Sequence, residues 1–175
     1  KNWQTVLQQR HQDIATAISQ ENGKTLTESL GEVKGAITKI DLSIQAYQPY
    51  SATTTETQDS LQLQCTHKPI GVLAVLGPFN FPFHLPMGHI VPGLLAGNAM
   101  ILKPSEHTPG IGNLLYESFV EARFPYPVLS CIQGGKDQGQ ALAVHPDIHG
   151  ILFTGSYQEA QSISTAIAHQ PEKLF

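Results

Sequence analysis

The chain has 175 residues, of which 41% are hydrophobic and 14% are charged, and its formal net charge is -4 at pH 7. This length suffices for one hydrophobic core, or for one domain with an appendage, and the composition is typical of an ordinary globular protein. No basic stripe accompanies the charge, so we expect neither a nucleic-acid partner nor a membrane partner. The longest apolar stretches, such as residues 90–96, are too short to span a bilayer.

Two helices are predicted in the first 50 residues. The first, over residues 3–20, has one apolar face and ends at Asn22-Gly23. Thr25 and Glu28 form a capping box for the second helix, which Pro49 ends. Apolar residues recur every three or four positions along this second helix, so it requires a partner surface. These apolar positions are Leu30, Val33, Ile37, Ile40, Ile44 and Tyr47.

The composition then becomes polar. Residues 51–60 are rich in Thr and Ser and are predicted to form a loop or linker. Leu61, Leu63 and Cys65 alternate with polar residues, which predicts a half-buried strand of the antiparallel type. We therefore divide the chain into N-terminal helices with a linker (1–60) and a second unit (61–175).

From Gly71 onward, short apolar strands alternate with helices. Strands are predicted at 72–76, 99–102, 128–132 and 148–153, and helices at 88–96, from Pro109 after a Thr108 cap, at 138–144 and after a Ser156–Glu159 capping box. This alternation predicts an α/β fold, a Rossmann-like, doubly wound parallel sheet that is incomplete at its C-terminal side, with the N-terminal helices packed on it. Ligands of such sheets bind at the carboxyl ends of the strands.

Polar residues and glycines gather at all four predicted strand ends. The four segments are Gly77-Pro78-Phe79-Asn80, Lys103-Pro104-Ser105-Glu106, Gln133-Gly134-Gly135 and Thr154-Gly155-Ser156. Glycines also permit a ligand to approach the backbone closely, at Gly135 and Gly139. The helix start behind Ser156 suits a phosphate, although a well-capped helix is an equal reading. A P-loop is rejected, because Gln140-Ala141 replace the required Lys and Ser or Thr.

Two of these segments suggest more specific chemistry. Lys103 and Glu106 can bond the two hydroxyls of a ribose, and the carboxylate would repel a 2′-phosphate, which favours NAD over NADP. The side-chain amide of Asn80 can donate a hydrogen bond to a developing oxyanion. A surface ion pair and a turn asparagine are the alternatives. His84 and His89 follow, and we interpret them as packed or capping side chains in preference to side chains that line a cleft.

Neither Cys65 nor Cys131 is nominated as a nucleophile, because neither lies beside an activating base or a helix start. Their spacing does not fit a metal site, so no metal is expected. No signal segment opens the chain, which makes a reducing cytoplasm the expected compartment. The chain begins at Lys1 rather than Met and ends at Phe175, and we expect it to be a fragment.

Taken together and in order, these motifs resemble the aldehyde dehydrogenase superfamily. The motifs that carry the resemblance are Pro78-Phe79-Asn80-Phe81-Pro82, Leu95-Ala96-Gly97-Asn98, Lys103-Pro104-Ser105-Glu106, Gly135-x-x-x-Gly139 and Phe153-Thr154-Gly155-Ser156. Within the superfamily the chain is most similar to the succinylglutamate semialdehyde dehydrogenases of bacterial arginine catabolism, at residues 21–26, 39–47 and 84–92. It departs from the superfamily at Phe79, where a tryptophan is common.

The resemblance implies that residues 61–175 are part of an NAD-binding domain, with NAD as the cofactor. It places Lys103 and Glu106 at the adenosine ribose and Ser156 at the pyrophosphate. Gly135 and Gly139 would let a helix approach the adenine side.

The resemblance also places Leu76 and Phe79 at the nicotinamide end and Asn80 in the oxyanion hole. The implied reaction oxidises a small-molecule aldehyde to a carboxylate: a cysteine thiolate adds to the aldehyde, hydride passes to NAD, and a glutamate activates water. In the family that cysteine and glutamate follow the Phe-Thr-Gly-Ser motif at a distance. The chain stops at Phe175 before either, so we expect the parent protein to be the enzyme and this chain alone to be inactive.

Other readings stay open at this point. An acylating relative would pass the thioester to coenzyme A, and another semialdehyde could be the substrate. In a different class, the chain could be a non-catalytic nucleotide-binding module. The parent protein is expected to be a homo-oligomer, as family members are.

Overall fold

The computed structural model describes residues 1–124 and 128–175. In chain order its elements are α1 (Asn2–Gln9), α2 (His11–Asn22), α3 (Leu26–Tyr47), the 3-10 helix η1 (Gln48–Tyr50), β1 (Thr54–Gln58), β2 (Leu61–Cys65), β3 (Val72–Leu76), α4 (His84–Leu95), β4 (Ala99–Lys103), α5 (Pro109–Glu121), β5 (Leu129–Cys131), α6 (Lys136–Val144), β6 (Gly150–Phe153) and α7 (Tyr157–Ile167). Over these two ranges, no helix has the length and apolar character needed to cross a membrane.

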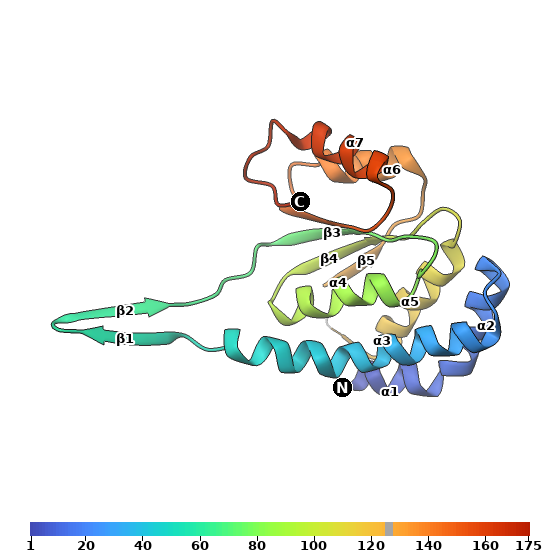
Figure 1. The fold of residues 1–175 in the computed structure, drawn as a ribbon, viewed down its shortest axis with the longest axis horizontal. Helices are drawn as coiled ribbons and strands as arrows, with labels where there is room; N and C mark the ends of the chain where they lie inside the picture. The colour runs from blue at the N-terminus through green and yellow to red at the C-terminus, as the bar shows by residue number, and fades with distance from the viewer. Residues whose placement is uncertain (125–127) are drawn as a thin grey trace.

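Four parallel strands form the central sheet, in the order β5-β4-β3-β6. Helices α1 to α5 lie on one face, and α6 and α7 cover the other (Figure 1). The chain moves outward from β3 to β4 and β5, and then crosses back to place β6 on the other side of β3. The predicted α/β doubly wound sheet with N-terminal helices is therefore confirmed.

Strand β3 separates two hydrophobic cores. Leu73 and Val75 pack in the larger core, which β3, β4 and β5 form with α1 to α5. Ala74 and Leu76 pack in the smaller core with α6, α7 and β6. Because successive side chains of a strand point to opposite faces, a continuous apolar run is what this position requires.

The first predicted helix is in fact two. Its backbone is interrupted at Arg10, where φ is -93° and ψ is 6°. The interruption reorients α1 relative to α2, and Trp3 of α1 is then buried, with its Nε1 donating to Ser118 Oγ on α5 at 2.9 Å. The predicted apolar face is otherwise correct, and Gly23 ends α2 in the left-handed conformation at φ 78°.

The polar linker predicted over residues 51–60 is wrong. Thr54–Gln58 form strand β1, which pairs antiparallel with β2. Threonine favours extended backbone, and residues 61–65 supply the hydrogen-bonding partner. The predicted strand at Leu61–Cys65 is present, but it is exposed along its whole length rather than half-buried. The hairpin projects away from the sheet (Figure 1), and its turn, residues 59 and 60, joins Gln58 to Leu61 at the predicted division.

One helix start and one helix cap differ from their predictions, because residues distant in sequence bond the first amides of these helices. Helix α4 begins at His84 rather than Gly88, and its first amides bond to the Glu32 carboxylate. Thr108 precedes α5 as predicted, but its hydroxyl makes no capping bond and is buried without a partner among the described residues. The amides of α5 are instead bonded by Glu21 of α2.

Candidate functional site

A cleft of about 340 Å³ lies at the carboxyl ends of β3, β4 and β6, beside the first turns of α6 and α7. Every site residue predicted from the sequence belongs to its lining. These residues are Leu76, Phe79, Asn80, Lys103, Glu106, Gly135, Gly139 and Ser156. The strand ends that the sequence analysis singled out thus converge on one cavity, as the crossover at β3 requires.

Lys103 and Glu106 form the polar centre of the cleft. Lys103 is 7% exposed, and its Nζ donates to the carbonyls of Pro104 at 2.8 Å and Gly134 at 2.6 Å. Burial lowers the pKa of Lys103, while the carboxylate of Glu106, 3.9 Å away, opposes that shift. The Glu106 side chain is half-exposed, so the pair presents a fixed cation and an accessible anion to a ligand.

Two glycines of the lining lie beside this pair. A Cβ at Gly139 would lie 3.3 Å from Lys103 Cε, so the glycine allows the lysine stem to pass along α6. A Cβ at Gly135 would lie 3.8 Å from Glu106 Oε1, which places that carboxylate against the start of α6. Gly134 adopts φ 149°, a conformation open to glycine, as the chain turns from β5 into the helix.

The other end of the cleft is more apolar. Leu76 is buried, whereas Phe79 is 57% exposed, and its ring meets His107 edge to face at 5.8 Å. Asn80 is exposed at the rim, and its Oδ1 accepts a hydrogen bond from the Phe81 amide at 3.0 Å. That bond fixes which end of the amide faces its own loop, and it leaves Nδ2 as the end with hydrogens to donate.

Ser156 opens α7 with the capping box that the sequence predicts. Its Oγ accepts from Glu159 N at 3.2 Å, and Glu159 Oε2 accepts from Ser156 N at 3.1 Å and from Ser156 Oγ at 2.8 Å. Glu159 also lines the cleft. A carboxylate therefore shares the helix start with any phosphate that binds there, which the sequence analysis did not anticipate.

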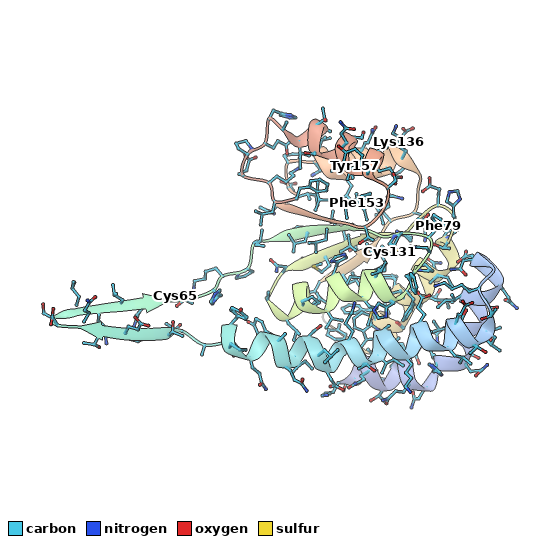
Figure 2. The ribbon with its side chains drawn as sticks, in the orientation of Figure 1. Cys65, Phe79, Cys131, Lys136, Phe153 and Tyr157 are labelled. Atoms are coloured by element: carbon cyan, nitrogen blue, oxygen red, sulfur yellow. The ribbon has the colours of Figure 1, made fainter. Side chains whose placement is uncertain are left out.

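Further lining residues were missed. His107, Lys136 and Phe153 belong to the cleft, and Figure 2 shows Lys136 and Phe153 above the sheet and Phe79 beyond the end of its strands. Lys136 directly follows Gly135 at a helix start, and that position in the sequence could have predicted that Lys136 lines the cleft. The ring of Phe153 explains Gly155, because a Cβ there would lie 2.4 Å from Phe153 Cζ.

The remaining reactive side chains lie apart from this lining. Burial raises the pKa of Cys131 to about 11, against a smaller lowering by Lys103. Cys65 lies on the projecting hairpin (Figure 2). Burial, followed by the charge of Lys39, lowers the pKa of both His84 and His89. His89 bonds to Thr154 Oγ1 at 3.2 Å, and His84 packs against Gly35, where a Cβ would lie 2.8 Å from His84 Nδ1, so both histidines are packed side chains.

Residues 1–174 match the aldehyde dehydrogenase family. The N-succinylglutamate 5-semialdehyde dehydrogenase of Yersinia pseudotuberculosis is 46% identical over 170 residues, covering 97% of this chain and 34% of that protein. The enzyme of the same name from Novosphingobium aromaticivorans is 46% identical over 166 residues, covering 93% of this chain and 35% of that protein. The chain thus spans about a third of the length of these curated relatives.

Solved structures give the same result. An aldehyde dehydrogenase from Bartonella henselae superposes with a TM-score of 0.93 at 30% identity, over 99% of this chain and 37% of that one. An NADP-dependent enzyme of E. coli superposes with a TM-score of 0.92 at 28% identity, over 99% of this chain and 36% of that one. An NAD-dependent aldehyde dehydrogenase from Sinorhizobium meliloti gives a TM-score of 0.92 at 25% identity, over 99% and 35%. With the family matched over residues 1–174 and the predicted site residues gathered in one cleft, the chain belongs to the aldehyde dehydrogenase family.

Proposed function

We propose that this chain supplies the cofactor-binding half of an NAD-dependent dehydrogenase that oxidises N-succinylglutamate 5-semialdehyde to N-succinylglutamate. The observation that carries the proposal is the convergence of all the predicted site residues on one cleft at the strand ends. The substrate is the one for which the relatives that are 46% identical are named.

The cleft fits a dinucleotide. Its polar centre offers an ammonium and a carboxylate 3.9 Å apart, a spacing that suits neighbouring hydroxyls of a ribose. Gly135 and Gly139 leave the space that side chains would fill. The apolar end, with Leu76 and Phe79, suits a planar ring. NAD, when bound, accepts the hydride from the substrate.

The residues of this chain would bind and orient. Lys103 and Glu106 would hold the ribose, Ser156 with the start of α7 would face the pyrophosphate, and Gly135 and Gly139 would admit the adenine side. Asn80 would donate its Nδ2 hydrogen to the carbonyl oxygen of the aldehyde as negative charge develops there. The nucleophile would come from outside residues 1–175, because Cys131 is held as a thiol and Cys65 lies on the distant hairpin.

The substrate assignment is tested with the full-length protein that carries this chain. We expect NAD-dependent oxidation of N-succinylglutamate 5-semialdehyde with a kcat/KM well above that for succinate semialdehyde and for simple aliphatic aldehydes. Preference for another aldehyde would keep the dehydrogenase and discard this substrate. Product released only as a coenzyme A ester would identify an acylating enzyme. Cofactor binding without turnover of any aldehyde would indicate a non-catalytic module.

The choice of NAD over NADP depends on Glu106. Its carboxylate, with Glu159 in the same lining, would repel a 2′-phosphate. Glu106→Gln keeps the shape and removes the charge, so we expect the ratio of kcat/KM for NAD to that for NADP to fall about tenfold, the equivalent of about 1.4 kcal/mol. Glu117→Gln, at an exposed position of α5, is the matched control. An unchanged ratio in Glu106→Gln would remove the argument for NAD.

We also propose that the full-length protein is a homo-oligomer and acts in the cytoplasm. The β1–β2 hairpin supports the first point, since it exposes Leu61 (65%) and Leu63 (52%) on a projecting pair of strands. The two free thiols, Cys65 and Cys131, support a reducing compartment. Sedimentation of the full-length protein, with a Leu61→Asp/Leu63→Asp variant for comparison, tests the first point, and cell fractionation tests the second.

A further inference from the structure

The end of α2, the turn after it and the first part of α3 contact the loop after β3 and the first turn of α5, which follows the loop after β4. One loop, residues 77–83 after β3, carries Phe79 and Asn80. The other, residues 104–108 after β4, carries Glu106. Residues 21–26 carry part of the family resemblance and the cap of α3, and they have no role in the proposed function.

The loop after β3 is held at three points. Asn22 Nδ2 donates to the Phe79 carbonyl at 3.3 Å. The Lys24 ammonium lies 3.6 Å from the centre of the Phe81 ring. The Glu32 Oε1 atom accepts the amides of Phe83 at 3.0 Å and His84 at 3.1 Å. Asn80 thus lies within a stretch of chain that is fixed on both sides.

Lys24 and Glu32 form one buried unit. Lys24 Nζ donates to Glu32 Oε2 at 2.5 Å, and the two side chains are 18% and 0% exposed. A buried carboxylate with two amide donors and an ammonium has its acceptor positions well satisfied, so its geometry is narrowly defined. Gly23, at φ 78°, turns the chain so that Lys24 follows directly after the end of α2.

The helix that follows the loop after β4 is held by a different residue. Both carboxylate oxygens of Glu21 accept amides of the first turn of α5, from Gly110 and Ile111, each at 2.8 Å. Helix α5 in turn packs closely against the loop at Gly112. A Cβ there would lie 2.3 Å from the ring of Pro104, so only glycine allows this approach. Fixing the start of α5 therefore fixes the path between Lys103 and Glu106.

We propose that Glu21, Lys24 and Glu32 are positioning residues that align the two ends of the cleft separately. Lys24 with Glu32 sets the Asn80 end, where the aldehyde would react, and Glu21 sets the Lys103–Glu106 end, where the ribose would bind. The assignment of these ends depends on the proposed function. The bracing itself depends only on the contacts described above.

In the full-length enzyme the two braces are separable by kinetics. Lys24→Met lowers kcat about tenfold or more, since small misplacements of a reacting group cost up to about a hundredfold, and leaves the Kd for NAD within about twofold. Glu21→Met raises the Kd for NAD about fivefold or more and leaves kcat at saturating NAD within about twofold. Lys24→Arg restores most of the kcat, and Lys34→Met, at an exposed lysine of α3, is the control. Parallel changes of kcat, Kd and melting temperature in both variants would overturn the proposal.

Amide hydrogen exchange of this chain gives a reading that does not need activity. In Lys24→Met and Glu32→Gln, exchange at Phe83 and His84 accelerates about tenfold or more, while Gly110 and Ile111 stay unchanged. In Glu21→Met, exchange at Gly110 and Ile111 accelerates instead, while Phe83 and His84 stay unchanged. If the wild-type enzyme oxidises no aldehyde, the proposed function fails while these exchange rates still decide whether the braces exist. Unchanged or uniformly raised exchange in the variants would refute the braces even in an active enzyme.

Discussion

The β1–β2 hairpin and the β3–β6 sheet are both made of short strands, but they differ in what surrounds them. Every residue of β1 and β2 is exposed, while β3 is buried at Leu73, Ala74, Val75 and Leu76. Alternation at Leu61–Cys65 predicts extended backbone correctly, since that follows from local preference. Burial instead needs a second surface: helices on both faces provide it for β3, and no described element provides it for the hairpin.

The largest test of this contrast uses the same substitution in both regions. Leu102→Ala in β4 removes a fully buried side chain from the larger core, and we expect the free energy of unfolding to fall by about 2–5 kcal/mol. Leu63→Ala in β2 removes a side chain that is 52% exposed, and we expect a change within about 0.5 kcal/mol. Urea denaturation monitored by circular dichroism measures both. A comparable loss in Leu63→Ala would show that the hairpin is packed against something in solution.

The two cysteines test the contrast without any substitution. Burial holds the pKa of Cys131 at about 11, against an ordinary value of 9.0, while Cys65 is exposed on the hairpin. Thiolate is the reacting species, so at pH 8 we expect the buried Cys131 to be alkylated much more slowly than the exposed Cys65. The alkylation rate of Cys131 should rise tenfold per pH unit until about pH 11, as long as the chain stays folded. Mass spectrometry of peptides labelled with iodoacetamide resolves the two sites, and equal rates would contradict the burial of Cys131.

The smallest effect concerns two residues with positive φ. Arg123 follows the end of α5 with φ 58°, and Asp59 occupies the hairpin turn with φ 55°. Arg123→Gly relieves the left-handed conformation beside the larger core and should stabilise the chain by up to about 1 kcal/mol. Asp59→Gly should leave the midpoint of global unfolding unchanged, because the hairpin turn opens without exposing the core. Thermal denaturation of both variants compares them, and a stabilised Asp59→Gly would couple the hairpin to the core.

Interactions that are local in sequence were predictable, and those between distant residues were not. The capping boxes of Thr25 with Glu28 and of Ser156 with Glu159 form as predicted, because both partners lie within one turn. The cap of α5 comes from Glu21, which is 89 residues from Gly110, and that distance explains why Thr108 was given the role. No spacing rule connects residues so far apart.

The site follows the same pattern. Strand-helix alternation predicted which residues meet at the sheet edge, because parallel strands align their carboxyl ends. Lys136 and His107 were missed, since their place in the lining depends on how α6 and the β4–α5 loop turn. The exposed position of Asn80 also depends on its loop, which is held by residues of α2 and α3.

The alternation along β3 also constrains how the length of this chain can change over time. Deleting or inserting a single residue within Val72–Leu76 would exchange the faces of the strand, sending Leu73 and Val75 toward α6 and α7 and Ala74 and Leu76 toward the larger core. Both cores would be mispacked by one event. Two-residue changes placed symmetrically in β1 and β2 would preserve their pairing and disturb neither core. Length variation among homologous proteins should therefore be absent from β3 and tolerated in the hairpin.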